Sequence, residues 1–290
     1  MSFRKLKAFL TVCECGNITR AAELLHITQP ALTRQIQELE KEFGCILFNR
    51  TKRKIELTEQ GFQLQLRATE MLELEQRTKQ ELKVAGGELA GIVRIGCVES
   101  KAAGLVTDFL SEWLMQSKRL SFELYSADGN DIRTKIDENY LDFGFCLEPI
   151  EVAKYDVVPF ETSDQWGVVV SRSTVYNKYA QIDREALMNI PLILPRRSLV
   201  LENLKSWFSL KQQNLRILGY HNLPTNALCM VKKGIGGLLC VEGSYAVRPD
   251  PELRFIALSP QRTVKHCLIR KKNRSLPKTS ELFWKYAGNS

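Results

Sequence analysis

Residues 21–36 of the chain read AAELLHITQPALTRQI, two helical runs separated by a short turn. Apolar side chains recur at helical spacing in both runs, and the chain turns through His26 and Ile27. Thr28 is a favourable N-cap residue, and Pro30 is tolerated in a first helical turn because the amides there have no intrahelical acceptor. The pattern predicts one helix over residues 19–25 and a second from about Gln29 to Phe43.

The second helix is predicted to bury one face and expose the other. Helical spacing assigns the core face to Ala31, Leu32, Ile36, Leu39 and Phe43. The opposite face then carries Gln29, Thr33, Arg34 and Gln37. When such a helix enters the major groove of DNA, glutamine suits adenine and arginine suits guanine or phosphate. Each side chain taken singly fits an ordinary solvated face, but the joint pattern favours DNA recognition.

The flanking segments extend this unit. A preceding helix is predicted from the spacing of Leu6, Phe9, Leu10 and Cys13, and Gly16-Asn17 ends it. Residues 45–48 and 54–57 are predicted to be two strands around the basic tip RTKR at 50–53, the arrangement of a wing. Four cations of this wing can neutralise flanking phosphates: Arg50, Lys52, Arg53 and Lys54.

A long helix is predicted from the capping residue Thr58 to about Ala85. Alternating steps of four and three residues along it give an imperfect heptad seam: Leu64, Ala68, Met71, Glu75, Thr78, Leu82 and Ala85. Because the apolar stripe would otherwise face water, the helix is expected to pair two subunits. Gly86-Gly87 then begins a linker.

From residue 92 the pattern changes to alternating strands and helices. Strands are predicted at 92–98, 120–125, 143–147, 166–170, 192–194, 216–220 and 237–241, and helices at 102–116, 131–140, 199–210 and 224–233. This alternation favours a parallel α/β sheet divided between two lobes. A strand at 264–269 and a helix at 280–286 are expected to return to the first lobe.

The composition narrows the class of protein. Hydrophobic residues make up 44% of the 290 residues and charged residues 26%, and no apolar run approaches the roughly 20 residues of a membrane span. The first residues lack a secretory signal, so a cytoplasmic protein with reduced cysteines is expected. A net charge of +8 suits a polyanionic partner. Cys13 and Cys15 lie too close for the usual zinc-ligand pair, and neither a metal nor another cofactor is expected.

Residues 21–36 resemble the helix-turn-helix signature of LysR-type transcription regulators. The resemblance continues through Leu39-Glu40, Phe43-Gly44, LFNR at 47–50 and LTEQG at 57–61, so that it covers residues 3–66. Residues 92–286 resemble the effector domain of that family more loosely. The resemblance implies an α/β protein with an α-rich winged helix-turn-helix domain at 1–58, a linker and dimerisation helix at 59–87, and a two-lobed effector domain like a periplasmic binding protein at 91–290. Lobe I would comprise about 91–162 and 267–290, and lobe II about 163–266.

The function implied by the resemblance is sequence-specific DNA binding under the control of a small molecule. The implied DNA contacts are Thr28, Gln29, Pro30, Thr33, Arg34, Gln37 and the four wing cations. The implied partners are double-stranded DNA, the effector, RNA polymerase and further copies of the chain, which form a homodimer through the linker helix and a homotetramer through the effector domains.

In that family the effector binds between the lobes, where general α/β reasoning also places ligands. The expected contacts are Glu99, Ser100, Lys101, Cys146, Leu147, Arg196, Arg197, Ser198 and Asn226. Free helix amides and the two arginines favour an organic anion, whereas Glu99 favours a cationic or neutral ligand. The arginines fit surface charges equally well. Cys97 and Cys146 invite comparison with redox sensors, although inert packing is the commoner role of buried cysteine.

Two rival classes fit less well. An enzyme would need a nucleophile elbow, a phosphate loop or a paired acid and base, and Gly234-Ile235-Gly236-Gly237 is only a weak glycine cluster. His26, His221 and His266 offer neither a triad nor a metal set. An exported solute-binding protein could share the two lobes, but it would leave residues 1–58 unexplained.

Overall fold

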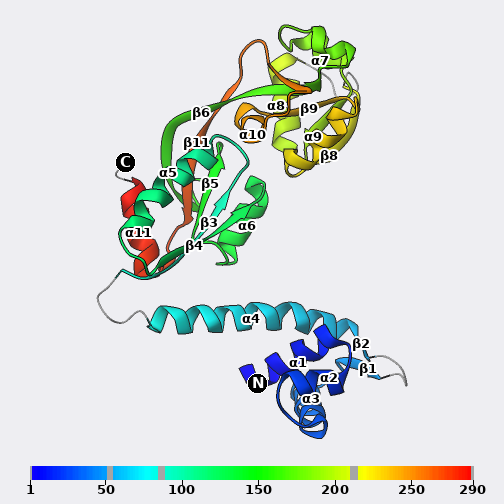
Figure 1. Ribbon diagram of the computed structural model, residues 1–290, viewed down its shortest axis with the longest axis vertical. Helices are drawn as coiled ribbons and strands as arrows, with labels where there is room; N and C mark the ends of the chain where they lie inside the picture. Colours follow the sequence, from blue (N-terminus) through cyan, green and yellow to red (C-terminus); the bar gives the residue numbers. More distant parts are fainter. Residues whose placement is uncertain (1, 51–54, 84–88, 210–214, 289–290) are drawn as a thin grey trace. The chain divides into compact units, whose positions relative to one another are not determined.

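The computed structural model describes residues 2–50, 55–83, 89–209 and 215–288 of the chain (Figure 1). Within these ranges only the backbone is described at a few positions, among them Arg50, Leu82 and Ser198. The chain divides into two compact units, Met1–Gly87 and Glu88–Ser290, which are taken separately below.

The N-terminal unit consists of four helices and a two-stranded hairpin. The elements are α1 (Phe3–Cys15), α2 (Ile18–Leu24), α3 (Gln29–Phe43), β1 (Phe48–Arg50), β2 (Ile55–Leu57) and α4 (Glu59–Lys83). Asn17 caps α2 by accepting a hydrogen bond from the amide of Arg20 at 3.1 Å, as its position predicts. Thr28 occupies the N-cap of α3, but its hydroxyl makes no capping hydrogen bond.

The core of this unit confirms only part of the face predicted for α3. Leu32, Ile36 and Leu39 are completely buried against α1 and α2. The predictions for Ala31 and Phe43 are wrong, because Ala31 is exposed and Phe43 is 44% exposed. Both lie at the edges of the apolar stripe, in the first and last turns of α3, where helical spacing alone does not tell whether a neighbouring element covers the side chain.

The first wing strand is shorter than predicted, beginning at Phe48 rather than Cys45. The carboxylate of Glu40 accepts the amide of Leu47 at 2.8 Å, and the side chain of Leu47 enters the core. β1 and β2 are antiparallel, with Phe48 opposite Leu57.

Three of the seven residues in the heptad seam predicted along α4 pack against the core of their own unit. Ala68 is fully buried, and Leu64 and Met71 pack partly buried against the core of their own unit. Leu64 and Met71 are therefore half-buried rather than a fully exposed stripe, and the pairing of two subunits along this helix stays a prediction. The side chain of Leu82 and the whole of Ala85 lie outside the described residues.

The C-terminal unit is the predicted two-lobed α/β structure. Its strands are β3 (Gly91–Cys97), β4 (Leu120–Ser126), β5 (Phe143–Leu147), β6 (Tyr155–Ser171), β7 (Leu192–Pro195), β8 (Ile217–His221), β9 (Gly237–Val241), β10 (Leu253–Ala257) and β11 (Thr263–Lys271). Its helices are α5 (Ala102–Met115), α6 (Gly129–Asp137), the 3-10 turn η1 (Val175–Lys178), α7 (Arg184–Asn189), α8 (Ser198–Phe208), α9 (Pro224–Lys232), α10 (Glu242–Ala246) and α11 (Lys278–Gly288).

The strands follow the order β4-β3-β5-β11-β6-β9-β7-β8, with β10 added beside β6. β3 pairs in parallel with β4 and β5 in the first lobe, and β7 pairs in parallel with β8 and β9 in the second. The expectation of a parallel sheet fails at the centre, where β6 and β11 pair antiparallel from one lobe to the other (Figure 1). β11 also pairs with β5, and α11 packs on the first lobe through Phe283, as predicted.

Candidate functional site

The polar face of α3 lies on the surface of the N-terminal unit, away from its core. Thr28, Gln29, Pro30, Arg34 and Gln37 are exposed, and Thr33 is half-buried. Two contacts run along the helix: the Gln29 amide donates to the Thr33 hydroxyl at 3.0 Å, and the Arg34 guanidinium pairs with Glu38 at 3.2 Å. Exposed pairs of this kind contribute little to stability, so both side chains can exchange these partners for base edges. Of the wing, Lys52, Arg53, Lys54 and the side chain of Arg50 lie outside the described residues.

The C-terminal unit contains a cavity of about 530 Å³ lined by both lobes. Lobe I contributes the ends of β3 and β5 and the start of α6, including Glu99, Asp128 and Leu147. Lobe II contributes the starts of α8 and α9 and the ends of β7, β8 and β9, including Arg197 and His221. The site therefore lies at the carboxyl ends of parallel strands, where α/β folds usually bind ligands.

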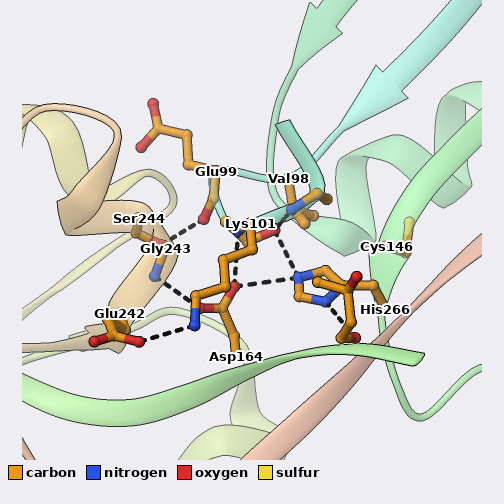
Figure 2. A network of polar contacts seen from close by, with 12 residues as sticks. Val98, Glu99, Lys101, Cys146, Asp164, Glu242, Gly243, Ser244 and His266 are labelled. Atoms are coloured by element: carbon orange, nitrogen blue, oxygen red, sulfur yellow. Dashed lines mark hydrogen bonds and ion pairs between the residues drawn. The ribbon is translucent and has the colours of Figure 1, made fainter. Parts of the chain in front are cut away.

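The structure brings together three of the residues expected to contact an effector: Glu99, Leu147 and Arg197. Burial lowers the pKa of the Arg197 guanidinium, and Arg133 nearby lowers it further. The Glu99 carboxylate accepts the Thr225 hydroxyl at 2.7 Å and points away from the polar network beneath it (Figure 2).

Five of the expected contacts lie elsewhere. Ser100 and Cys146 are completely buried, and Asn226 is an exposed residue of α9 outside the cavity wall. Lys101 pairs with Glu242 at 2.9 Å, and Arg196 pairs with Asp128 and Asp131, both at 2.6 Å. Position at a strand-to-helix junction predicted the neighbourhood of Ser100, Lys101 and Arg196 but not the direction of their side chains. The side chain of Ser198 lies outside the described residues.

Ser100 is completely buried, and its hydroxyl joins a network centred on Asp164 and His266, which Figure 2 shows from close by. His266 contacts the Ser100 hydroxyl at 3.1 Å through Nε2, which also lies 3.1 Å from the Asp164 carboxylate. Asp164 and His266 have no exposed side-chain surface.

The same carboxylate joins the two lobes through backbone amides. Asp164 accepts the amide of Lys101, in the loop after β3, at 2.8 Å and the amide of Gly243, in α10, at 2.7 Å. Burial opposes the ionised form, but the hydrogen bonds from His266 and the two amides outweigh it, so that the pKa of Asp164 is lowered. A buried charge satisfied in this way fixes the loop that carries Glu99.

Cys97 and Cys146 are buried in the core of lobe I and do not line the cavity, and they are unsuited to redox sensing. Burial raises the pKa of both Cys97 and Cys146 to about 12, so neither thiol is ionised near neutral pH. Thiolate rather than thiol is the reactive form, and these side chains therefore act as small core residues.

Sequence reasoning missed the aromatic wall of the cavity. Trp166 in β6 and Trp207 in α8 line it, with ring centroids 6.3 Å apart, and Val200, Val241 and Asn203 complete this side. Both tryptophans follow the apolar spacing of ordinary core residues, so only the tertiary arrangement identifies them. The described residues contain no cluster that could hold a metal ion, and no described helix is long and apolar enough to cross a membrane.

Comparison with known proteins covers both units. The family described as bacterial regulatory helix-turn-helix protein, lysR family, matches residues 3–62, and the LysR substrate binding domain matches residues 86–290. The chain is 30% identical over 171 residues to the HTH-type transcriptional regulator YtlI of Bacillus subtilis, across 59% of this chain and 55% of that protein. It is 28% identical over 246 residues to the nitrogen assimilation regulatory protein nac of Klebsiella aerogenes, across 84% and 79%.

The fold is shared with solved regulators. CbnR complexed with its target DNA has a TM-score of 0.80 at 23% identity, covering 100% of this chain and 99% of that one. HinK, a LysR family transcriptional regulator from Pseudomonas aeruginosa, has a TM-score of 0.55 at 21% identity, covering 100% of this chain and 98% of that one.

Proposed function

The chain belongs to the LysR family of bacterial transcription regulators, which bind DNA through a helix-turn-helix and are not enzymes, and from this we propose how it reads DNA and what controls it. The α3 helix enters the major groove with Gln29, Thr33 and Arg34 toward the bases, while the wing cations bind flanking phosphates. The observation that supports this role is the exposed polar face of α3, backed by three completely buried apolar residues.

The proposed base contacts of Gln29 and Arg34 can be tested in the full chain with DNA that the protein selects from a random pool. Gln29→Ala and Arg34→Ala should each weaken binding to the selected sequence by about 1–3 kcal/mol and leave binding to scrambled DNA nearly unchanged. Lys41→Ala removes an exposed charge from the last turn of α3 and serves as the control. Equal losses on selected and scrambled DNA would show that α3 does not read sequence.

The effector is proposed to occupy the cavity between the lobes. Both lobes supply its wall, so a ligand bound there stabilises one relative position of the lobes over others, which is the differential binding that control requires. The regulator acts in the cytoplasm as a homodimer paired through α4 and a homotetramer completed by the effector domains, with RNA polymerase as a further partner. No cofactor other than the effector is proposed.

Filling the cavity tests this assignment. Asn203→Trp places an indole at the cavity wall, whereas Glu202→Trp places one on the exposed side of the same helix. The small-molecule fraction of a host-cell extract should change the DNA affinity of the unaltered protein and of Glu202→Trp, but not that of Asn203→Trp. A full response from Asn203→Trp, with its DNA binding and folding intact, would place the effector elsewhere.

A further inference from the structure

Two residues of opposite charge line the inter-lobe cavity, and neither forms an ion pair with another residue that the structure describes. Arg197 belongs to the wall contributed by lobe II, and Glu99 to the wall contributed by lobe I. The other charged groups of the wall are satisfied differently: Asp128 pairs with Arg196, Lys265 pairs with Glu161 at 3.7 Å, and Glu148 is exposed to solvent.

On the cationic side of the cavity, Arg197 has no carboxylate within ion-pair distance among the described residues, although the charge of the nearby Asp128 favours its charged form. The only hydrogen bond that Arg197 donates within the described chain is to the Pro149 carbonyl, at 3.3 Å. Arg133 lies close enough to disfavour the charge on Arg197, and its Nη1 is buried without a hydrogen-bond partner among the described residues. Guanidinium groups without carboxylate partners are suited to binding an anion in bidentate fashion.

On the anionic side of the cavity, the hydrogen-bond donors to the Glu99 carboxylate are uncharged groups. Glu99 accepts the hydroxyl of Thr225 at 2.7 Å and its amide at 3.4 Å, at the start of α9. His221 also lines this part of the wall, but burial lowers its pKa, so the imidazole is neutral and supplies no counter-charge. A carboxylate has about four acceptor sites, so Glu99 retains capacity for a donor from the ligand.

An apolar surface accompanies the two charges. Trp166, Trp207, Val200, Val241 and Leu147 belong to the same wall. A cavity of about 530 Å³ accommodates a small molecule with an aliphatic or aromatic body.

We propose that the effector is a small zwitterion of the amino-acid type, whose carboxylate binds Arg197, whose protonated amine binds Glu99, and whose apolar body lies against the tryptophans. This inference rests on the proposed effector role of the cavity and replaces the expected simple anion. An anion alone would desolvate Glu99 without a partner, and a cation alone would do the same to Arg197, and both arrangements are unfavourable. The zwitterion satisfies both groups, which is how a site excludes analogues that lack one charge.

Matched probes separate the two charges. L-phenylalanine, 3-phenylpropionate and 2-phenylethylamine share one body, as do L-leucine, 4-methylpentanoate and isopentylamine. Binding to the full chain is measured by calorimetry and by the fluorescence of the cavity tryptophans. At least one of the two amino acids should bind about tenfold or more tightly than its acid and its amine, because hydrogen bonds between charged groups contribute a decade of affinity or more.

Variants of Glu99 and Arg197 test which residue binds the amine of the ligand and which binds its carboxylate. Glu99→Gln should weaken the amino acid about tenfold and should bind the acid more tightly than the unaltered protein does, because no unpaired carboxylate is then desolvated. Arg197→Gln should weaken the amino acid and the acid and should bind the amine more tightly, for the corresponding reason. Lys265→Gln and Glu148→Gln, which remove other charges from the wall, should leave all affinities within about twofold.

The inference is overturned if an acid binds as tightly as its amino acid, or if neither amino acid binds at millimolar concentration. Tight binding of an acid that is lost in Arg197→Gln would leave the proposed cavity role intact and reject only the amine contact. An amino acid whose affinity survives both Glu99→Gln and Asn203→Trp would instead count against the cavity itself.

Discussion

Asp164 links the two lobes, because its buried carboxylate accepts a backbone amide from each of them. Nothing in the local sequence SDQW marks this role, since the aspartate stands in a strand between polar neighbours. Its partners, Lys101, Gly243 and His266, are distant in sequence. The sequence suggested that Ser100 would face a ligand, and it could not show that His266 would hold the hydroxyl instead.

Asp164→Asn should lower the free energy of unfolding by about 1–3 kcal/mol, because the amide offers one acceptor oxygen where the carboxylate offers two and a buried N–H is left unsatisfied. Urea unfolding of the full chain, followed by near-ultraviolet circular dichroism, measures the change. Asp156→Asn is the matched control on the same strand, since Asp156 is partly exposed and paired with Arg270. Its effect should stay below about 1 kcal/mol, and equal effects of the two variants would reject the role assigned to Asp164.

The effect of Asp164 should also depend on pH. The pKa of this carboxyl is lowered below its ordinary value of 3.8 in the folded chain, so its stabilising contribution is complete above that value and is lost as the pH falls through the folded-state pKa. The difference in stability between the unaltered protein and Asp164→Asn should therefore be constant near neutral pH and should shrink below about pH 4. A difference that grows on acidification would contradict the sign.

At the scale of elements, the sequence predicted those features that residues close together in the chain determine, such as the ends of a helix. The α3 helix has the predicted bounds because Pro30 in its first turn and the left-handed Gly44 at its C-cap act within one turn of its ends, although the Thr28 hydroxyl does not cap it. The β6 strand, with 17 residues, was predicted only at its end. Polar residues such as Glu161 and Asp164 interrupt its apolar pattern, and pairing with β11 holds it extended regardless. Long-range pairing of this kind leaves no periodic signal in the strand itself.

The α4 helix carries a second apolar face in addition to the predicted seam. Phe62 is 65% exposed, and Leu66 and Leu74 are each 61% exposed, on the side opposite Ala68. Steps of four and eight residues keep these side chains on one side of the helix. This face, rather than Leu64 and Met71, is expected to receive the second subunit.

Leu66→Asp combined with Leu74→Asp should weaken subunit pairing in the full chain by tenfold or more, since a buried leucine contributes about 1.5–3 kcal/mol. Light scattering across a dilution series measures the mass, and circular dichroism checks that the helices remain. Ala68→Asp, two residues from Leu66 on the buried face, should instead unfold the N-terminal unit. An unchanged mass for the double variant would exclude this face as the interface.

At the scale of the whole molecule, the family and both units could be inferred from sequence, but the chemistry of the cavity could not. The helix-turn-helix signature is a contiguous pattern, whereas the cavity wall is assembled from segments between Val98 and Lys265. Position at the ends of strands predicted that Glu99, Leu147 and Arg197 would belong to one site, and all three line the cavity. It gave no indication that Arg196 would turn outward to Asp128 and Asp131, or that two tryptophans would provide the apolar surface.

The paired strands β6 and β11, which run from one lobe to the other, also determine the order in which the chain forms the two lobes. Gln165 and Thr263 are opposed on β6 and β11, and most of the second lobe lies between them in sequence. Most of that lobe is consequently an insertion between two paired strands, and the chain enters and leaves it at neighbouring positions. Recombination at these two points can exchange the half of the sensor that carries Arg197 and Trp207 while the hydrogen-bonded ladder of the other half stays closed. Such an architecture lets a regulator acquire a new chemical input without rebuilding the part that reads DNA.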